Sequence, residues 1–176
     1  MPTYITPLGH EALIREYEFL LKQERPRITA EVQYAASLGD RSENAEYQYG
    51  KQRLREIDRR LRYLQKRLEG VEVIDPADFT GPVVRFGATV VGEDEEEREL
   101  HYQIVGKDEI DTKRGLISYV SPLGRALVGC SEGDDVVFEA PGGTRELVII
   151  EVLYPARGEG RSGRAVAADT DSADAT

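Results

Sequence analysis

The chain has 176 residues, a formal net charge of −10 and a single cysteine, Cys130. This length suits one to two small domains, and the negative charge argues against a protein that coats nucleic acid without regard to sequence. One cysteine and two histidines, His10 and His101, exclude an internal disulfide framework and a structural zinc site. We find no membrane-spanning apolar stretch and no signal pattern, and therefore expect a soluble, cytoplasmic protein without membrane contact.

The first predicted helix begins at Thr6, a suitable N-cap, with Pro7 in its first turn. Its apolar stripe is formed by Ile14, Tyr17, Leu21, Ile28, Val32 and Ala35. Pro26 lies within this stretch and predicts a kink, because the stripe continues beyond it and does not favour two separate helices.

A second helix is predicted by apolar residues in three-four alternation, which is typical of a coiled-coil seam. The seam consists of Tyr47, Leu54, Ile57, Leu61, Leu64 and Leu68, with Gly50 as its gap. Gly70 predicts a left-handed C-terminal cap. Only a tight reversal fits at 37–42, so we expect residues 1–74 to form an antiparallel coiled coil about 45 Å long at 1.5 Å per residue. A rod with so narrow a core is suited to reaching into another molecule.

The pattern changes near 71–76 to short β-branched runs, which predict a separate α+β domain at 75–156. Its expected parts are strands at 83–91, 99–105, 116–120, 135–140 and 146–153, turns at 92–94 and 141–143, and one helix opened by Ser121 and Pro122. A small, mostly antiparallel sheet packed on one helix fits this order. The composition of 157–176 predicts a disordered tail.

Two carboxylates, Asp40 and Glu43, lie three residues apart in the predicted reversal. Their spacing alone favours a helix cap, in which Asp40 caps the second helix and Glu43 reaches back to it. Their expected place at the far end of a rod favours a task on another molecule instead. Mg²⁺ binds carboxylate oxygens and often takes only one or two of them together with phosphate oxygens. The pair could therefore bring Mg²⁺ to a site that another molecule completes.

Between positions 51 and 67 the second helix has eight cations and only two acids, Glu56 and Asp58. These cations are Lys51, Arg53, Arg55, Arg59, Arg60, Arg62, Lys66 and Arg67. If Glu56 pairs with Arg60 and Asp58 with Arg62, six positive charges have no acidic partner in this helix. The pattern is therefore compatible with a solvated helix face and equally with a phosphate-binding strip. Tyr47 and Tyr49 could add base stacking.

Two stretches of the sequence resemble a known family, the Gre transcript elongation factors. The run from Ala35 to Tyr49 reads AASLGDRSENAEYQY and resembles the family's tip, and Arg41-Ser42 is nearer to the GreB pattern than to the GreA pattern. The C-terminal signature is matched by Ile117-Ser118, Ser121-Pro122, Arg125-Ala126-Leu127 and Gly133-Asp134. Val120 departs from the Asp or Asn that usually precedes the Ser-Pro pair.

The resemblance implies an N-terminal antiparallel coiled coil and a C-terminal FKBP-like domain in a monomer. It also implies docking of the C-terminal domain, through Ser121 and Pro122, at the rim of the RNA polymerase secondary channel, which the coiled coil enters. Asp40 and Glu43 would help to hold a second Mg²⁺ in the polymerase active site, where backtracked RNA is cut, so the protein would be an accessory factor and not an enzyme. The residues expected to contact the 3′ segment of the nascent RNA are Lys51, Arg53, Arg55, Arg59 and Arg60.

Three other interpretations compete with this one. A Gre-like inhibitor would occupy the channel without promoting cleavage, and the intact Asp40 and Glu43 pair argues against it. A stand-alone nuclease would need a complete metal site of its own. A structural coiled-coil adaptor would tolerate replacement of both carboxylates.

Overall fold

The computed structural model describes residues 2–39 and 44–157. The chain divides into two compact units, Met1–Val73 and a second unit that begins at Ile74. The predicted tail at 158–176 lies outside the described residues, as does the middle of the predicted reversal at 40–43. Within the described residues, no helix combines the length and the apolar character that a bilayer crossing requires.

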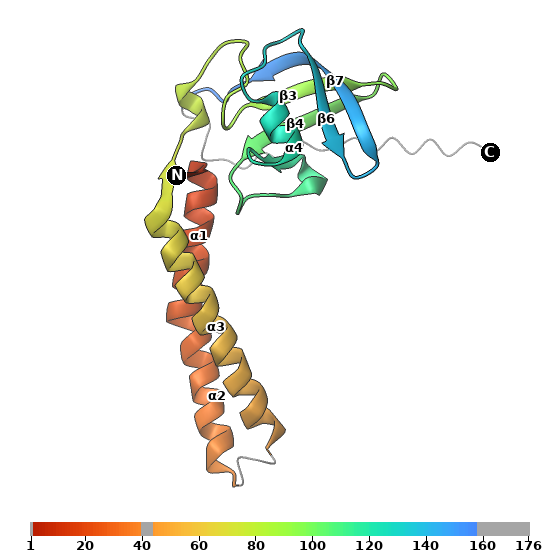
Figure 1. Ribbon diagram of the computed structural model, residues 1–176. Helices are drawn as coiled ribbons and strands as arrows, with labels where there is room; N and C mark the ends of the chain where they lie inside the picture. The colour runs from red at the N-terminus through yellow and green to blue at the C-terminus, as the bar shows by residue number, and fades with distance from the viewer. Residues whose placement is uncertain (1, 40–43, 158–176) are drawn as a thin grey trace, which may run out of the picture. The chain divides into compact units, whose positions relative to one another are not determined.

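The N-terminal unit is a helical hairpin, as the sequence predicted (Figure 1). Its first arm comprises α1 (Pro7–Phe19), a short π-helical segment (Leu20–Glu24) and α2 (Arg25–Ser37), and α3 (Ala45–Gly70) forms the second arm. A parallel pair of three-residue strands, β1 (Thr3–Ile5) and β2 (Val71–Val73), joins the two ends of the unit. This strand pair was not predicted from the sequence, because three residues are too few to show a strand period.

The ends of the helices follow local chemistry. Thr6 caps α1, and its hydroxyl accepts a 3.1 Å hydrogen bond from the Gly9 amide, as predicted. The predicted left-handed cap at Gly70 is wrong, because α3 runs through Gly70 and the chain continues directly into the extended backbone of β2 at Val71. Pairing of β2 with β1 therefore decides how the helix ends.

Pro26 disturbs the first arm through a π-turn. The Arg25 amide donates to the carbonyl of Leu20, five residues back, and this wider turn uses one residue more than an α-turn. The extra residue shifts every upstream position by one. Leu13 and Leu20 are therefore buried, whereas the predicted stripe residues Ile14 and Leu21 are 38% and 42% exposed. The predicted stripe is therefore wrong at Ile14 and Leu21. It is correct at Tyr17, which packs against the core, and after Pro26, where Ile28 and Ala35 are buried.

The hairpin core is a single line of apolar contacts between the arms. Its buried members are Ile5, Leu13, Leu20, Ile28, Ile57 and Leu64. The predicted seam of α3 is confirmed, because Leu54, Leu61 and Leu68 pack against this cluster. The seam gap also has a structural reason: a Cβ atom on Gly50 would lie 2.5 Å from Cγ2 of Val32, so glycine permits close approach of α2 and α3.

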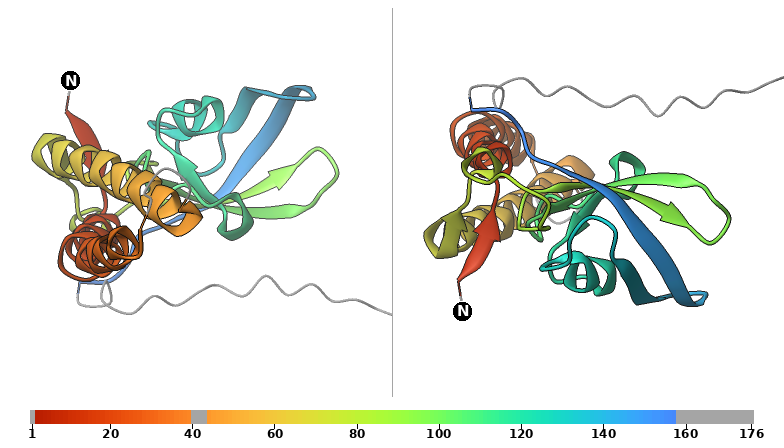
Figure 2. Two further views of the ribbon diagram at one scale, coloured as in Figure 1. Left: turned by 90° about the horizontal axis from the view of Figure 1, so that it is seen from below. Right: turned by 90° about the horizontal axis from the view of Figure 1, so that it is seen from above.

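The second unit is a mixed five-stranded sheet with one α-helix in its described part, α4 (Pro122–Leu127). The strands are β3 (Thr89–Asp94), β4 (Glu99–Val105), β5 (Leu116–Ser118), β6 (Asp135–Ala140) and β7 (Gly143–Leu153), in the order β5-β4-β3-β7-β6. α4 lies beside β5 and β6 (Figure 2). The predicted α+β class is confirmed.

Three details of this sheet differ from the prediction. β4 and β5 are parallel, because the connection between them, which contains a 3₁₀ turn at Thr112–Arg114, returns the chain to run in the same direction. The first strand begins at Thr89, and Val83 forms only an isolated bridge to Ser131. The predicted turn at 92–94 lies inside β3, and the reversal follows Asp94, whose carbonyl accepts from the Glu97 amide.

Candidate functional site

The two predicted metal-presenting residues, Asp40 and Glu43, lie outside the described residues. The described chain places their neighbours on both sides. α2 ends at Ser37, and α3 begins at Ala45 with Asn44 as its N-cap. The cap that the spacing assigned to Asp40 therefore belongs to Asn44, and the interpretation of Asp40 and Glu43 as a capping box is wrong.

Asn44 connects the two arms beside this segment. Its Oδ1 accepts from the Tyr47 amide at 3.1 Å, and its Nδ2 donates to the Ala35 carbonyl at 2.9 Å. The first bond satisfies a free amide at the start of α3. The second gives the Ala35 carbonyl near the end of α2 a further donor, besides the Leu38 amide at 3.2 Å. One side chain thus fixes both helix ends from which the segment 40–43 extends.

Ion pairs between the arms reinforce the apolar seam. Arg60 donates through Nε and Nη2 to both carboxylate oxygens of Glu16, at 2.6 and 2.9 Å. Arg25 donates through Nε to Oδ1 of Asp58 at 2.8 Å, and this hydrogen bond raises the pKa of the Arg25 guanidinium. Pairing of Asp58 with Arg62 in its own helix was expected from the sequence. In the structure Asp58 pairs with Arg25 of the other arm, because both residues flank the seam.

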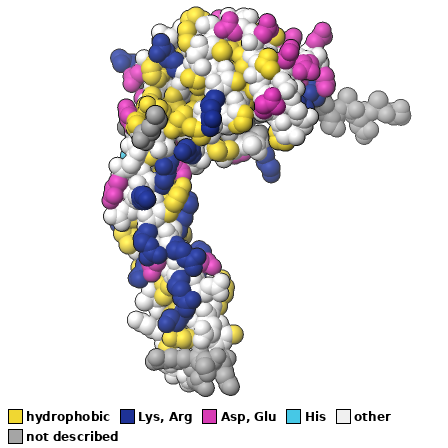
Figure 3. Space-filling view, viewed as in Figure 1, with side chains coloured by type: hydrophobic (Ala, Val, Ile, Leu, Met, Phe, Trp, Pro, Cys, Tyr) yellow, Lys and Arg dark blue, Asp and Glu magenta, His cyan; other side chains and the backbone are white. Residues whose placement is uncertain are grey.

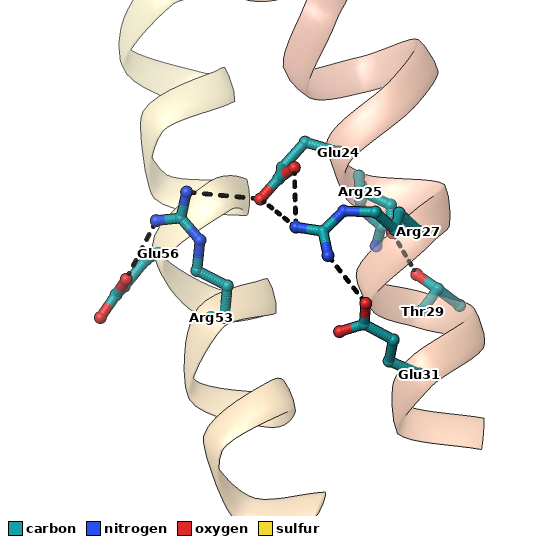
Figure 4. A network of polar contacts seen from close by, with 7 residues as sticks. All are labelled: Glu24, Arg25, Arg27, Thr29, Glu31, Arg53 and Glu56. Carbon is teal, nitrogen blue, oxygen red and sulfur yellow. Dashed lines mark hydrogen bonds and ion pairs between the residues drawn. The ribbon is translucent and has the colours of Figure 1, made fainter. Parts of the chain in front are cut away.

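Glu24 is the centre of a larger network on one flank of the hairpin (Figure 4). It accepts from Arg27 at 3.0 and 3.1 Å, and Arg53 of α3 lies 3.6 Å from it. Arg27 also donates to Glu31 at 2.7 Å, and Arg53 donates to Glu56 at 3.3 Å. Only 13% of the Glu24 side chain is exposed. Its carboxylate therefore needs the two arginines as partners.

A second group of cations lies on the outer face of α3. This cationic stripe consists of Lys51, Arg55, Arg59, Arg62 and Lys66. Successive helical residues are about 100° apart, so the five side chains fall within an arc of about 80°. All five are exposed, and none forms an ion pair with another described residue. Figure 3 shows Lys and Arg side chains gathered along the hairpin.

The structure separates the predicted RNA-contacting residues into two sets. Lys51, Arg55 and Arg59 belong to the cationic stripe. Arg53 and Arg60 lie about 150° around the helix from the centre of the stripe, and each is paired with an acid of the first arm. The first set is available to an external phosphate, and the second set stabilises the hairpin.

The predicted docking residues, Ser121 and Pro122, open α4 in the second unit. The Ser121 hydroxyl donates to the Ser118 carbonyl at 2.6 Å and accepts from the Gly124 amide at 3.0 Å. Arg125 donates to the Val120 carbonyl at 2.7 Å. Ser121 thus shapes the loop through internal bonds, and Pro122 is exposed.

Comparison with known families decides the identity of the chain. The family model described as "Transcription elongation factor, N-terminal" matches residues 3–73, and the model described as "Transcription elongation factor, GreA/GreB, C-term" matches residues 80–154. The chain belongs to the GreA/GreB family of transcription elongation factors. The resemblance that the sequence predicted is confirmed.

Individual relatives in the GreA/GreB family agree with the family models. The transcription elongation factor GreB of Pasteurella multocida is 51% identical over 151 residues, which cover 86% of this chain and 96% of that protein. GreB of Neisseria meningitidis is 50% identical over 153 residues, which cover 86% of this chain and 93% of that protein. Among solved structures, Gfh1 of Thermus thermophilus is 24% identical, covers 87% of this chain and 99% of its own, and has a TM-score of 0.40.

Whether this GreA/GreB member can hold a metal ion depends on which side chains offer donor atoms. Among the described residues, no group of three or more His, Cys, Asp or Glu side chains is arranged to hold a metal ion. Asp40 and Glu43 carry hard oxygen donors of the kind that Mg²⁺ prefers, and Mg²⁺ keeps several waters when it binds to one or two carboxylates. The donor chemistry of this pair therefore fits part of a magnesium coordination shell.

Three residues that build this site, Asn44, Glu16 and Glu24, were not predicted from the sequence. Asn44 carries a recognisable signal, because Asn is a preferred N-cap and stands just before the seam begins at Tyr47. Glu16 and Glu24 carry no such signal for their cross-arm role, since their partners on α3, Arg60 and Arg53, lie more than twenty-five residues away in the sequence.

Proposed function

We infer that this GreA/GreB member binds RNA polymerase, inserts the end of its hairpin into the secondary channel, and stimulates Mg²⁺-dependent cleavage of backtracked RNA by the polymerase active site. The observation that carries this proposal is the braced hairpin whose two arms are joined through Asp40 and Glu43. In this role the chain is an accessory factor, and the polymerase supplies the catalytic centre.

The hairpin has the dimensions and the bracing of a probe. The 26 residues of α3 span about 39 Å at 1.5 Å per residue. The apolar seam, the pairs Arg60–Glu16 and Arg25–Asp58, and the Asn44 bridge hold the two arms in one register. Such a rod delivers the segment at its end to a fixed place, which positioning of a metal requires.

Asp40 and Glu43 would act as metal ligands inside the polymerase. When bound, Mg²⁺ there would help to activate the attacking water in phosphodiester hydrolysis and to stabilise the leaving oxygen. The carboxylates supply oxygen donors, and the described residues of this chain supply their placement through the Asn44 bridge. The polymerase would provide the remaining ligands.

The cationic stripe would hold the extruded RNA. Five cations on one helical face at intervals of three or four residues follow a phosphate backbone better than scattered charges do. Lys51, Arg55 and Arg59 are exposed and free of ion pairs within the described chain, so they can bind phosphates without breaking the hairpin. Arginine also suits bidentate phosphate contacts.

The start of α4 would dock at the channel rim. The internal bonds of Ser121 and Arg125 hold the loop 118–121 in one conformation. The exposed Pro122 and the neighbouring Val120 are therefore already ordered before a partner binds. Ordering before binding lowers the entropy cost of association. Val120 makes this contact less polar than the Asp or Asn that the resemblance led us to expect.

The test is a cleavage assay on defined complexes. Purified protein is added to artificially backtracked elongation complexes in Mg²⁺, and shortening of the labelled RNA is followed. We expect faster cleavage with the protein than with polymerase alone. Slower nucleotide addition without added cleavage would identify a channel inhibitor, and cleavage of free RNA without polymerase would identify a nuclease.

A further inference from the structure

A groove lies between α2 and α3 near the ends of the helices that Asn44 connects. It is a half-open cavity of about 460 Å³. Its lining residues are Glu31, Tyr34, Ala45, Glu46, Tyr49 and Gly50. The two tyrosines come from opposite arms and are 67% and 69% exposed.

Gly50 lets the two arms come close together beside the groove. Without a side chain at this seam position, the backbone of α3 approaches Val32 closely. The neighbouring tyrosines, Tyr34 and Tyr49, border the groove but are not part of the apolar core. Two large aromatic side chains so exposed around one hollow are typical of a recognition surface.

The charges of the groove select its occupant. Glu31 is already paired with Arg27 at 2.7 Å, whereas Glu46 forms no ion pair with another described residue. A carboxylate beside two aromatic rings attracts a cation, through both the charge and the ring faces. The same carboxylates repel phosphate. Glu46 also lies about 180° around the helix from the centre of the cationic stripe, so RNA on the stripe would leave the groove free.

We propose that the groove bounded by Tyr34, Tyr49 and Glu46 binds an arginine side chain of RNA polymerase. This rests on the proposed function, since it names a contact with the same partner. A guanidinium stacks on tyrosine and forms paired hydrogen bonds with a carboxylate in one plane, which an ammonium group does not. The groove thereby gives the hairpin a protein contact on one flank while the opposite flank is cationic.

The test measures polymerase affinity with the full-length chain. Tyr49→Ala and Glu46→Gln should each weaken binding about 3- to 30-fold, and Tyr49→Phe should stay within about twofold because the ring face is kept. The matched control is Glu72→Gln, an exposed acid of β2 outside the groove, which should bind like the unchanged chain. Unchanged affinity of Tyr49→Ala would overturn the proposal.

A cross-linking arm identifies the occupant. A benzophenone side chain placed at position 34 should cross-link, in the backtracked complex, to a polymerase segment that contains an arginine. Cross-linking to RNA would show that the groove holds a base and would overturn the proposal. The cleavage assay distinguishes failure of the groove proposal from failure of the proposed function. If the unchanged chain stimulates cleavage and Tyr49→Ala binds polymerase normally, only the groove proposal fails. If the unchanged chain does not bind polymerase, both fail.

Discussion

Glu24 and Arg53 lie 3.6 Å apart across the hairpin, and Glu24 occupies a position in line with the buried seam residues Leu20 and Ile28. A carboxylate in this line costs desolvation, which the arginines offset. It also penalises a slip of one arm along the other, because a shifted carboxylate would meet apolar side chains. The pair therefore contributes to register as well as to stability.

Removal of this carboxylate should destabilise the hairpin measurably. We expect Glu24→Ala to lower the free energy of unfolding of the N-terminal unit by about 1–2 kcal/mol, because Arg27 and Arg53 lose a shared partner. Urea unfolding followed by circular dichroism measures the change. Glu18→Ala removes an exposed carboxylate whose ion-pair partner among the described residues is Lys22, and this change should cost less than about 0.5 kcal/mol. Equal effects of the two substitutions would contradict the role of Glu24.

Gly50 and Gly70 offer a matched comparison on one helix. Gly50→Ala should destabilise the hairpin by about 1–2 kcal/mol, because the new Cβ overlaps Val32 and this overpacking exceeds the gain in helix propensity. Gly70→Ala meets no heavy atom within 4 Å and should be neutral or slightly stabilising. Adding Val32→Ala to Gly50→Ala should recover part of the loss in a thermal melt. A loss that grows instead would show that close packing at Gly50 is not the cause.

The two hydrogen bonds of the Asn44 side chain can be tested separately. Asn44→Ala loses both and should cost about 1–2 kcal/mol in unfolding free energy. Asn44→Asp keeps the acceptor for the Tyr47 amide but loses the donor to the Ala35 carbonyl. The unfolding free energy should therefore fall less than in Asn44→Ala, but stimulation of cleavage should still decrease. Hydrogen exchange of the first amides of α3 reports the cap directly. Full activity of Asn44→Asp would show that the bridge to Ala35 does not position the tip.

The tip carboxylates should matter for cleavage and not for binding. Asp40→Ala and Glu43→Ala are each expected to reduce stimulated cleavage by at least about 100-fold, a loss typical of removing a catalytic electrostatic contact. Affinity for polymerase, measured by competition, should change little. If both variants cleave at the normal rate, the metal-ligand role is refuted. Partial rescue at higher Mg²⁺ would support it.

The cationic stripe should affect deep backtracking most. Replacement of Lys51, Arg55 and Arg59 by Gln removes three phosphate contacts, so rescue of deeply backtracked complexes should fall more than rescue of shallow ones, with a weaker dependence on salt. Arg60→Gln serves as the contrasting variant, because Arg60 is paired with Glu16 and its loss should appear mainly in hairpin stability. Equal loss at both backtracking depths would argue against an RNA contact for the stripe.

Local sequence determined the parts of the fold that depend on neighbours along the chain. The seam of α3 followed from its spacing, and the caps at Thr6 and Ser121 followed from residue type. The strands at 99–105 and 135–140 followed from their runs of β-branched and aromatic residues. The metal-presenting role proposed for Asp40 and Glu43 also comes from the sequence and stays a prediction, because both residues lie outside the described ones.

Only the tertiary structure decided the features that depend on partners far away in the sequence. The π-turn before Pro26 moved burial from Leu21 to Leu20, and the pairing of β1 with β2 set the end of α3. Bonds between the arms determined which cations form ion pairs within the hairpin, such as Arg60, and which form none with another described residue, such as Arg55. The physical reason is that an ion pair or a register is selected by the side chain opposite, and neither residue type nor spacing within one helix specifies what lies opposite.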